Sequence, residues 1–129
     1  MLLLGHIGIT AFIATFFYLP ATFAVAGVLL PDIFDKALFL SGLSPCGRFF
    51  GHSLFFAPVL GATVYAITKR SDFALAIMLG SFLHIAEDIS YFVPFLYPVK
   101  SYAFASICGP LEVSLGVFEM ITEGLGVAL

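Results

Sequence analysis

Charged residues are scarce in this chain, and their scarcity excludes several classes of protein. The five basic and eight acidic residues make up 10% of 129 residues, against about a quarter in an ordinary soluble domain. The net charge is −3, and no Lys/Arg run is longer than a pair, which leaves no basic surface for a nucleic acid. We therefore expect no nucleic-acid partner.

Cysteines are also few. Cys46 and Cys108 stand alone, without the paired spacing of a metal-binding motif. Because an isolated cysteine usually behaves as a small buried apolar residue, we favour free thiols over a disulfide for both. The cysteines therefore predict no thiolate metal site.

Apolar residues take the place of the missing charges. They make up 61% of the chain, and the mean hydropathy is +1.13. A soluble fold of this length cannot bury so much apolar surface, so we expect a single all-α integral membrane domain over residues 1–129. Its orientation stays open, because Lys36, Arg48 and Lys100 on one side are balanced against Lys69 and Arg70 on the other.

The apolar residues fall into separate runs. A bilayer is spanned by about 20 helical residues, which two of the runs can supply. A stretch rich in Ser, Gly and Pro, residues 37–51, is expected to be a loop. We predict a small bundle of about four to five helices, drawn from the runs 2–30, 52–68, 73–97 and 103–129.

The first run decides whether distant polar residues can meet. As one straight helix it would separate His6 from Asp32 by about 39 Å. Pro20 removes a helical hydrogen bond and disfavours helix at Leu19, so it marks either a kink or a reversal. We favour a helical hairpin broken at Pro20, because it brings His6 back to the level of Asp32.

Polar side chains form short clusters inside this apolar chain. Ionisable groups in such surroundings usually pair, line a wet cavity or bind an ion. His84 and Asp88 are four residues apart and share one helical face. Two further carboxylates three residues apart repel unless a cation or proton lies between them. The candidate metal ligands are His6, Asp32, Asp35, His52, His84 and Asp88.

Nitrogen and oxygen ligands of this kind suit Zn, Mn or Fe rather than a thiolate-preferring ion. The set is large enough for one or two divalent ions, with Zn or Mn favoured. Two-metal sites activate a water for displacement, typically at phosphorus. Arg48 lies four residues before His52, and its planar fork can clamp a phosphate.

Each candidate also has a purely structural explanation. His84 with Asp88, deep in an apolar run, is the pair least easily explained in this way, although an ion pair without metal stays open. Glu87 points to a neighbouring face, where it either supports a ligand residue or lies at the interface; we favour the interfacial position. The structural alternatives for the others are a hydrogen-bonded helix residue for His6, a helix cap for Asp32, a solvated pair for Asp35 with Lys36, and an interfacial position for His52.

The order of these motifs resembles a known family. Gly5-His6, Leu29 to Lys36, Gly51-His52-Ser53 and Gly80 to His84 with Asp88 are similar to motifs of the membrane-bound metal-dependent hydrolases. These are small membrane proteins of bacteria and archaea, some described as LexA-regulated. The resemblance covers most of residues 1–100, implies a prokaryotic cell membrane, and implies the same six metal-site residues.

The chain departs from the family pattern at two places. Many relatives carry a tighter Pro-Asp-x-Asp-His motif where this chain has Pro31 to Lys36, which loses one histidine. The usual His-Arg-Gly before the central His-Ser is replaced by Gly47-Arg48-Phe49-Phe50. Glu112, after Gly109-Pro110, is a candidate for an extra catalytic carboxylate.

Three functions compete on this evidence. The first is a membrane hydrolase that acts on the phosphoester of a lipid-like or amphiphilic substrate, with Arg48 and Glu112 in catalytic roles. The second is a metal-binding module without catalysis, in transport or sensing. The third is a proton-coupled or structural helical protein that binds no metal. Membrane lipid is the expected partner, and burial of the site predicts a homo-oligomer.

Overall fold

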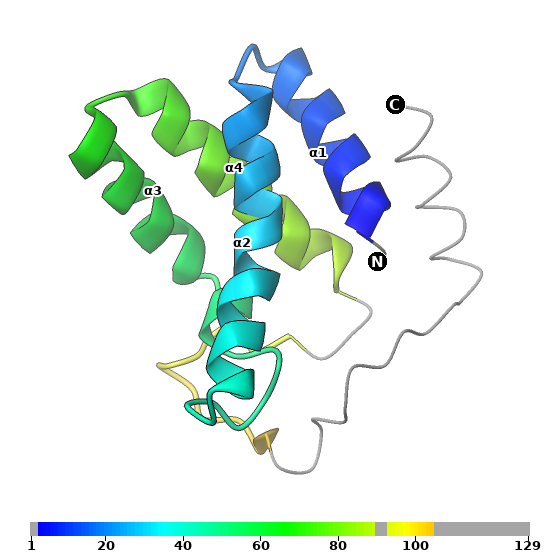
Figure 1. The fold of residues 1–129 in the computed structure, drawn as a ribbon, viewed down its shortest axis with the longest axis vertical. Coiled ribbons are helices and arrows are strands. Elements are labelled where there is room, and N and C mark those ends of the chain that lie inside the picture. The colour runs from blue at the N-terminus through cyan, green and yellow to red at the C-terminus, as the bar shows by residue number, and fades with distance from the viewer. Residues whose placement is uncertain (1–2, 90–92, 105–129) are drawn as a thin grey trace.

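The computed structural model describes residues 3–89 and 93–104, and this part of the chain is all-helical (Figure 1). Its elements are α1 (Leu3–Phe16), α2 (Ala21–Leu40), the 3-10 turn η1 (Phe50–His52), α3 (Phe56–Thr68) and α4 (Ser71–Glu87). The expectation of an all-α chain is therefore confirmed for the described residues.

The expected integral membrane bundle is wrong. Among the described residues, no helix combines the length and the apolarity needed to cross a membrane. The run 52–68 is helical only from Phe56, and α4 ends at Glu87 after 17 residues. The longest helix, α2, has 20 residues but carries Asp32, Asp35 and Lys36 in its second half. Hydropathy summed over a run did not reveal where each helix ends.

The chain reverses between α1 and α2. Tyr18 takes a left-handed conformation with φ 56°, and Pro20 is the extended residue before α2. Because proline fixes its own φ and cannot donate, it suits a helix start. The Pro20 carbonyl then accepts the N–H groups of Phe23 and Ala24. The two helices pack against each other, so α1 lies alongside α2 in the opposite direction (Figure 1).

Helices α2 and α4 make the most extensive contact in the described part of the fold. Their backbones touch at two glycines: a Cβ on Gly80 would lie 2.0 Å from the Ala24 carbonyl oxygen, and one on Gly27 would lie 2.2 Å from the Ile77 oxygen. The Ser81 hydroxyl donates to the Gly27 carbonyl across the same contact, at 2.9 Å. This close approach brings the two polar segments of α2 and α4 together.

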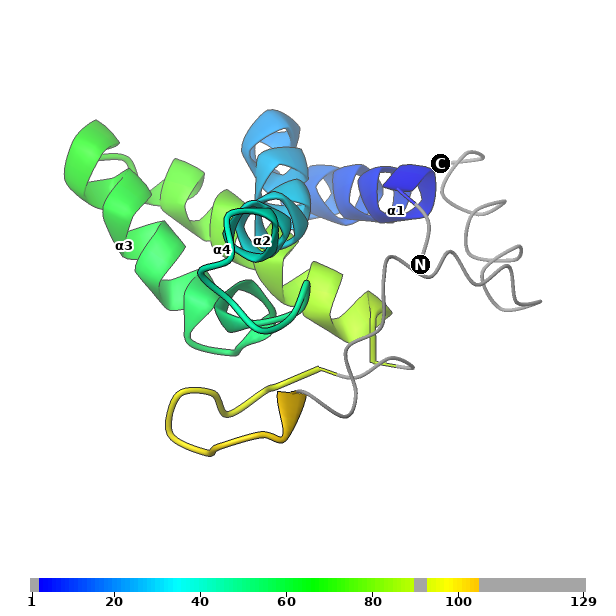
Figure 2. The same ribbon diagram turned by 60° about the horizontal axis from the view of Figure 1, so that its bottom comes forward.

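The candidate polar residues gather at one end of the bundle, which is closed by η1 and by the loop 41–49 before it. The segment 93–104 passes beneath this loop (Figure 2), and Phe49 packs against Tyr97 and Phe104. A second tie is the hydrogen bond from the Leu54 N–H to the Phe95 carbonyl. These contacts tie the loop and η1 to the segment 93–104.

Cys46 lies in this loop and is disulfide-bonded. The interpretation of Cys46 as a free thiol is therefore wrong. A buried small thiol and a buried disulfide sulfur occupy similar apolar surroundings, so the local sequence could not separate them. Cys108 lies outside the described residues.

Candidate metal centre

Three side chains from three separate elements converge at one end of the fold. Asp32 comes from α2, His52 from η1 and His84 from the last turn of α4. The Nε2 atoms of His52 and His84 are 3.1 Å apart, and Asp32 Oδ1 lies 3.5 and 3.9 Å from them, respectively. Ligand atoms about 2.1 Å from a tetrahedral ion lie about 3.4 Å from one another. The three atoms are thus spaced as a ligand set, the one such group in the described part of the chain.

The set is closed on the histidine side and open on the carboxylate side. The side chains of His52 and His84 are 0% and 1% exposed, whereas that of Asp32 is 32% exposed. Catalytic zinc sites characteristically have three protein ligands and one position for water or substrate. A metal held here would therefore be reached past Asp32.

Asp35, directly behind His52, is fully buried and accepts four hydrogen bonds. Its Oδ2 accepts from the backbone of Phe49 and His52 and, at 2.7 Å, from His52 Nδ1, while Oδ1 accepts from the Gly51 N–H. Because the carboxylate can only accept, His52 carries a proton on Nδ1, and its Nε2 faces Asp32 and His84. Metal-bound histidines are oriented by carboxylates in this way.

Gly51 makes this arrangement sterically feasible. A Cβ at this position would lie 2.6 Å from the Pro31 carbonyl oxygen and 2.9 Å from the Asp35 carboxyl carbon. The loop backbone can therefore reach the Asp35 carboxylate only because residue 51 has no side chain. Each residue of the Gly51-His52 pair thus has a structural reason: Gly51 allows the close backbone approach, and His52 donates to Asp35.

Charges around the set differ between its members. Burial, together with the neighbouring His52 and His6, lowers the pKa of His84 to about 3, so its imidazole is neutral. Burial also acts to lower the pKa of His52, but Asp32 and Asp35 outweigh it and raise that pKa. Burial alone would raise the pKa of Asp32, yet His52 and Lys36 hold it below the usual range. A metal ion would meet one neutral imidazole and replace a proton on the other.

Two basic side chains lie at the rim. Lys36 Nζ is 2.8 Å from Asp32 Oδ2, and an Arg48 guanidinium nitrogen is 3.1 Å from Asp88 Oδ2. That oxygen of Asp88 is 4.0 Å from His52 Nε2, which places the Arg48–Asp88 pair beside the ligand set. Both cations are partly exposed and can meet an anion that approaches the set.

His6 joins the same region from α1. Its ring stacks on that of His84 with a centroid separation of 4.7 Å. Its Nδ1 contacts Glu87 Oε2, and its Nε2 lies 3.5 Å from Asp88 Oδ1. Burial acts to lower the pKa of His6, but the two carboxylates outweigh it and raise the pKa to about 9.

The described structure thus gathers the candidate residues into one region but gives them different positions. Only Asp32, His52 and His84 form the three-ligand group. The remaining members of the predicted ligand set lie around the group and stay predictions as ligands: His6, Asp35 and Asp88. Arg48 lies at the rim, and its catalytic role is likewise a prediction. Glu112 lies outside the described residues.

Two pairings differ from the favoured sequence interpretation. Glu87 is buried against His6, as in the less favoured alternative of a supporting partner, and Lys36 pairs with Asp32 rather than with its neighbour Asp35. The spacing of Asp32 and Lys36, four apart on one helix, carried a signal for the second pair. Glu87 contacts a residue 81 positions away, so no local pattern indicated it.

Comparison with protein families matches residues 1–125 to a family described as YdjM inner membrane protein. The match spans nearly the whole chain, and the description indicates the cell membrane. No curated protein and no solved structure matches significantly. The chain therefore belongs to the YdjM inner membrane protein family.

Proposed function

We propose that this protein is a metal-dependent hydrolase of the cell membrane that acts on a phosphoester of a lipid-like or amphiphilic substrate. The observation that carries the proposal is the convergence of Asp32, His52 and His84 at ligand spacing. Two imidazoles and a carboxylate suit Zn or Mn.

The donor set fits a metal ion on two independent grounds. Asp35 holds His52 with Nε2 directed into the set, and His84 is a neutral imidazole. Both are required of histidine ligands, which bind as neutral rings. When bound, the ion would supply a water activated for attack and a positive charge for the developing oxyanion.

Recognition of a phosphoester is assigned to the rim. Arg48 presents a planar, permanently charged guanidinium beside the set, and Lys36 adds a second cation next to Asp32. Each is held by a carboxylate, which positions the cation before a substrate arrives. The family's location at the cell membrane supports an amphiphile rather than a freely soluble ester.

The experiment combines elemental analysis with hydrolysis by protein purified from membranes in detergent. Wild type is compared with Asp32→Ala and His84→Ala, and Asp72→Ala, an exposed aspartate away from the site, is the matched control. We expect bound Zn or Mn, hydrolysis of p-nitrophenyl phosphate or a short-chain phosphatidic acid, and loss of both in the two site variants.

Two results would count against the proposal. Absence of metal after reconstitution with Zn and Mn would leave an ion-pair cluster without metal chemistry. Stoichiometric metal without hydrolysis of any phosphoester would favour a metal-binding module in transport or sensing, the rival function.

A further inference from the structure

Two histidines of this region are held in the same way. His52 has Nδ1 against the Asp35 carboxylate and Nε2 at 3.5 Å from a carboxylate oxygen of Asp32. His6 has Nδ1 against the Glu87 carboxylate and Nε2 at 3.5 Å from Asp88 Oδ1. Each unit therefore has an orienting carboxylate on one ring nitrogen and a ligand-type oxygen near the other.

Asp88 lies between the two units. Its Oδ1 faces His6 Nε2, and its Oδ2 is 4.0 Å from Nε2 of His52, a member of the first ligand set. Carboxylates with one oxygen toward each of two ions are suited to bridge a two-metal site, in which the ions lie roughly 3.5–4 Å apart. The side chain of Asp88 is 3% exposed, so this position is shielded from bulk water.

Buried polar atoms of the second unit lack protein partners. The Glu87 side chain is nine-tenths buried and faces His6 through Oε2, while its Oε1 is buried without a hydrogen-bond partner in the described structure. Nδ1 of His84, whose ring stacks on His6, is in the same condition. Uncompensated buried polar atoms are costly, and a nearby cation offsets the cost for the carboxylate.

From this duplicated geometry we infer that His6 and Asp88 hold a second divalent cation, with Glu87 as the residue that positions His6 and Asp88 as the bridge to the first ion. The inference rests on the proposed metal site and makes it a two-metal centre. A second ion agrees with the phosphoester substrate already proposed, because two adjacent ions would stabilise both the attacking and the leaving oxygens of its displacement.

The test is a titration of the full-length, metal-stripped protein with Mn²⁺ alone, followed by electron paramagnetic resonance. Wild type is expected to bind two equivalents and to give the spectrum of an exchange-coupled pair. His6→Ala is expected to bind one equivalent with the spectrum of an isolated ion. Glu87→Gln, which keeps shape and burial, is expected to weaken the second equivalent by about 10- to 100-fold. Asp72→Ala is the control and should match wild type.

The outcomes separate this inference from the proposed function. One equivalent in wild type, unchanged in His6→Ala and lost in His52→Ala, would overturn the second ion and leave the hydrolase proposal intact. Loss of all Mn²⁺ in a His6→Ala protein with native circular dichroism would also overturn it, because the two ions would not be separable. No binding in wild type would overturn both.

Discussion

The two ends of this fold differ in the burial and hydrogen bonding of their carboxylates. At the η1 end, Asp35 is fully buried and its two oxygens accept four hydrogen bonds. At the α3–α4 turn, Asp72 and Arg70 form an exposed pair, with the Arg70 guanidinium over the Phe73 ring. A buried carboxylate that loses a hydrogen bond destabilises the fold, because no water replaces the partner. Each member of an exposed pair is solvated with or without its partner, so its loss costs little.

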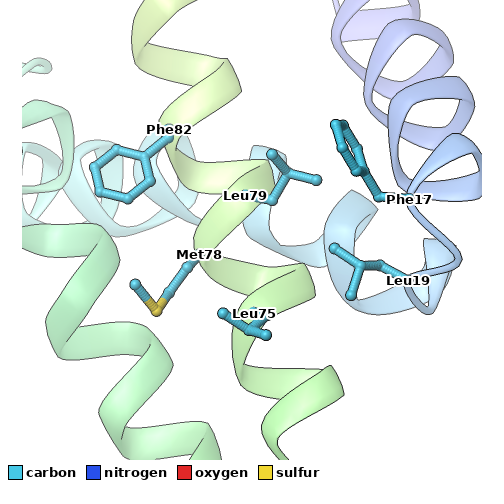
Figure 3. A pocket seen from close by; sticks show the side chains of 6 residues that line it. All are labelled: Phe17, Leu19, Leu75, Met78, Leu79 and Phe82. Carbon is cyan, nitrogen blue, oxygen red and sulfur yellow. The ribbon is translucent and has the colours of Figure 1, made fainter.

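A second contrast, between apolar and polar side chains, lies along α4, on the side of the helix away from α2. A groove of about 430 Å³ is bordered there by apolar side chains alone (Figure 3). Its lining comes from the α1–α2 turn and from one face of α4, namely Phe17, Leu19, Leu75, Met78, Leu79 and Phe82. The α4 residues that line the groove are apolar, whereas Ser81 and His84 on the same helix point into the fold. The buried face of α4 is itself mainly apolar and carries these two polar residues toward its C-terminal end.

Filling the α2–α4 contact should have the largest effect. Gly80→Val would place atoms against the Ala24 carbonyl and the Val28 amide, which are backbone and cannot move aside as a side chain can. Because α2 and α4 would separate, we expect loss of cooperative unfolding and of metal binding, or destabilisation that exceeds about 4 kcal/mol. Thermal unfolding by circular dichroism measures this.

Gly47→Ala is the matched control for that change. A Cβ there meets nothing within 4 Å and the residue has no positive φ, so unfolding should be unchanged within about 0.5 kcal/mol. Equal destabilisation by the two substitutions would contradict the close α2–α4 contact.

Asp35→Ala should come next in size. The change leaves the N–H groups of Phe49 and Gly51 and the His52 ring without their acceptor inside a closed loop. We expect destabilisation of about 4 kcal/mol and a metal affinity lowered by at least about 10- to 100-fold. Chemical denaturation and Mn²⁺ titration measure the two effects.

The corresponding change at the other end is Asp72→Ala. It removes an exposed carboxylate that pairs with Arg70, two residues earlier in the chain. We expect no measurable change in metal affinity and little in stability. If Asp72→Ala and Asp35→Ala behaved alike, the contrast between the two ends would be lost.

How far the sequence predicts this molecule depends on the range of the interaction concerned. The helical class and the reversal at Pro20 follow from hydropathy runs and from proline geometry. The start of α3 did not, because Gly51 and His52 are held in a 3-10 turn by Asp35, sixteen and seventeen residues earlier. The start of α3 therefore depends on a tertiary contact, and this shortens the helix expected from the run 52–68.

The candidate site shows the same division. Asp32, His52 and His84 could be named as candidates because ionisable groups are conspicuous in an apolar chain. The different position of Asp35, behind His52 rather than in the three-ligand group, could not be foreseen. Two aspartates three residues apart look equivalent in sequence, and only the path of the loop distinguishes the exposed Asp32 from the buried Asp35.

The pH dependence of the metal-free protein should give a smaller effect than Gly80→Val or Asp35→Ala. Because the folded pKa of His6 is raised from 6.5 to about 9, its protonation stabilises the fold fully below pH 6.5. That contribution is lost as pH rises through about 9, and it amounts to at most about 3 kcal/mol. We expect the unfolding temperature in EDTA to fall between pH 6.5 and 9, and to fall less in His6→Gln. An equal fall in both proteins would mean that the His6 contacts with Glu87 and Asp88 add no pH-dependent stability.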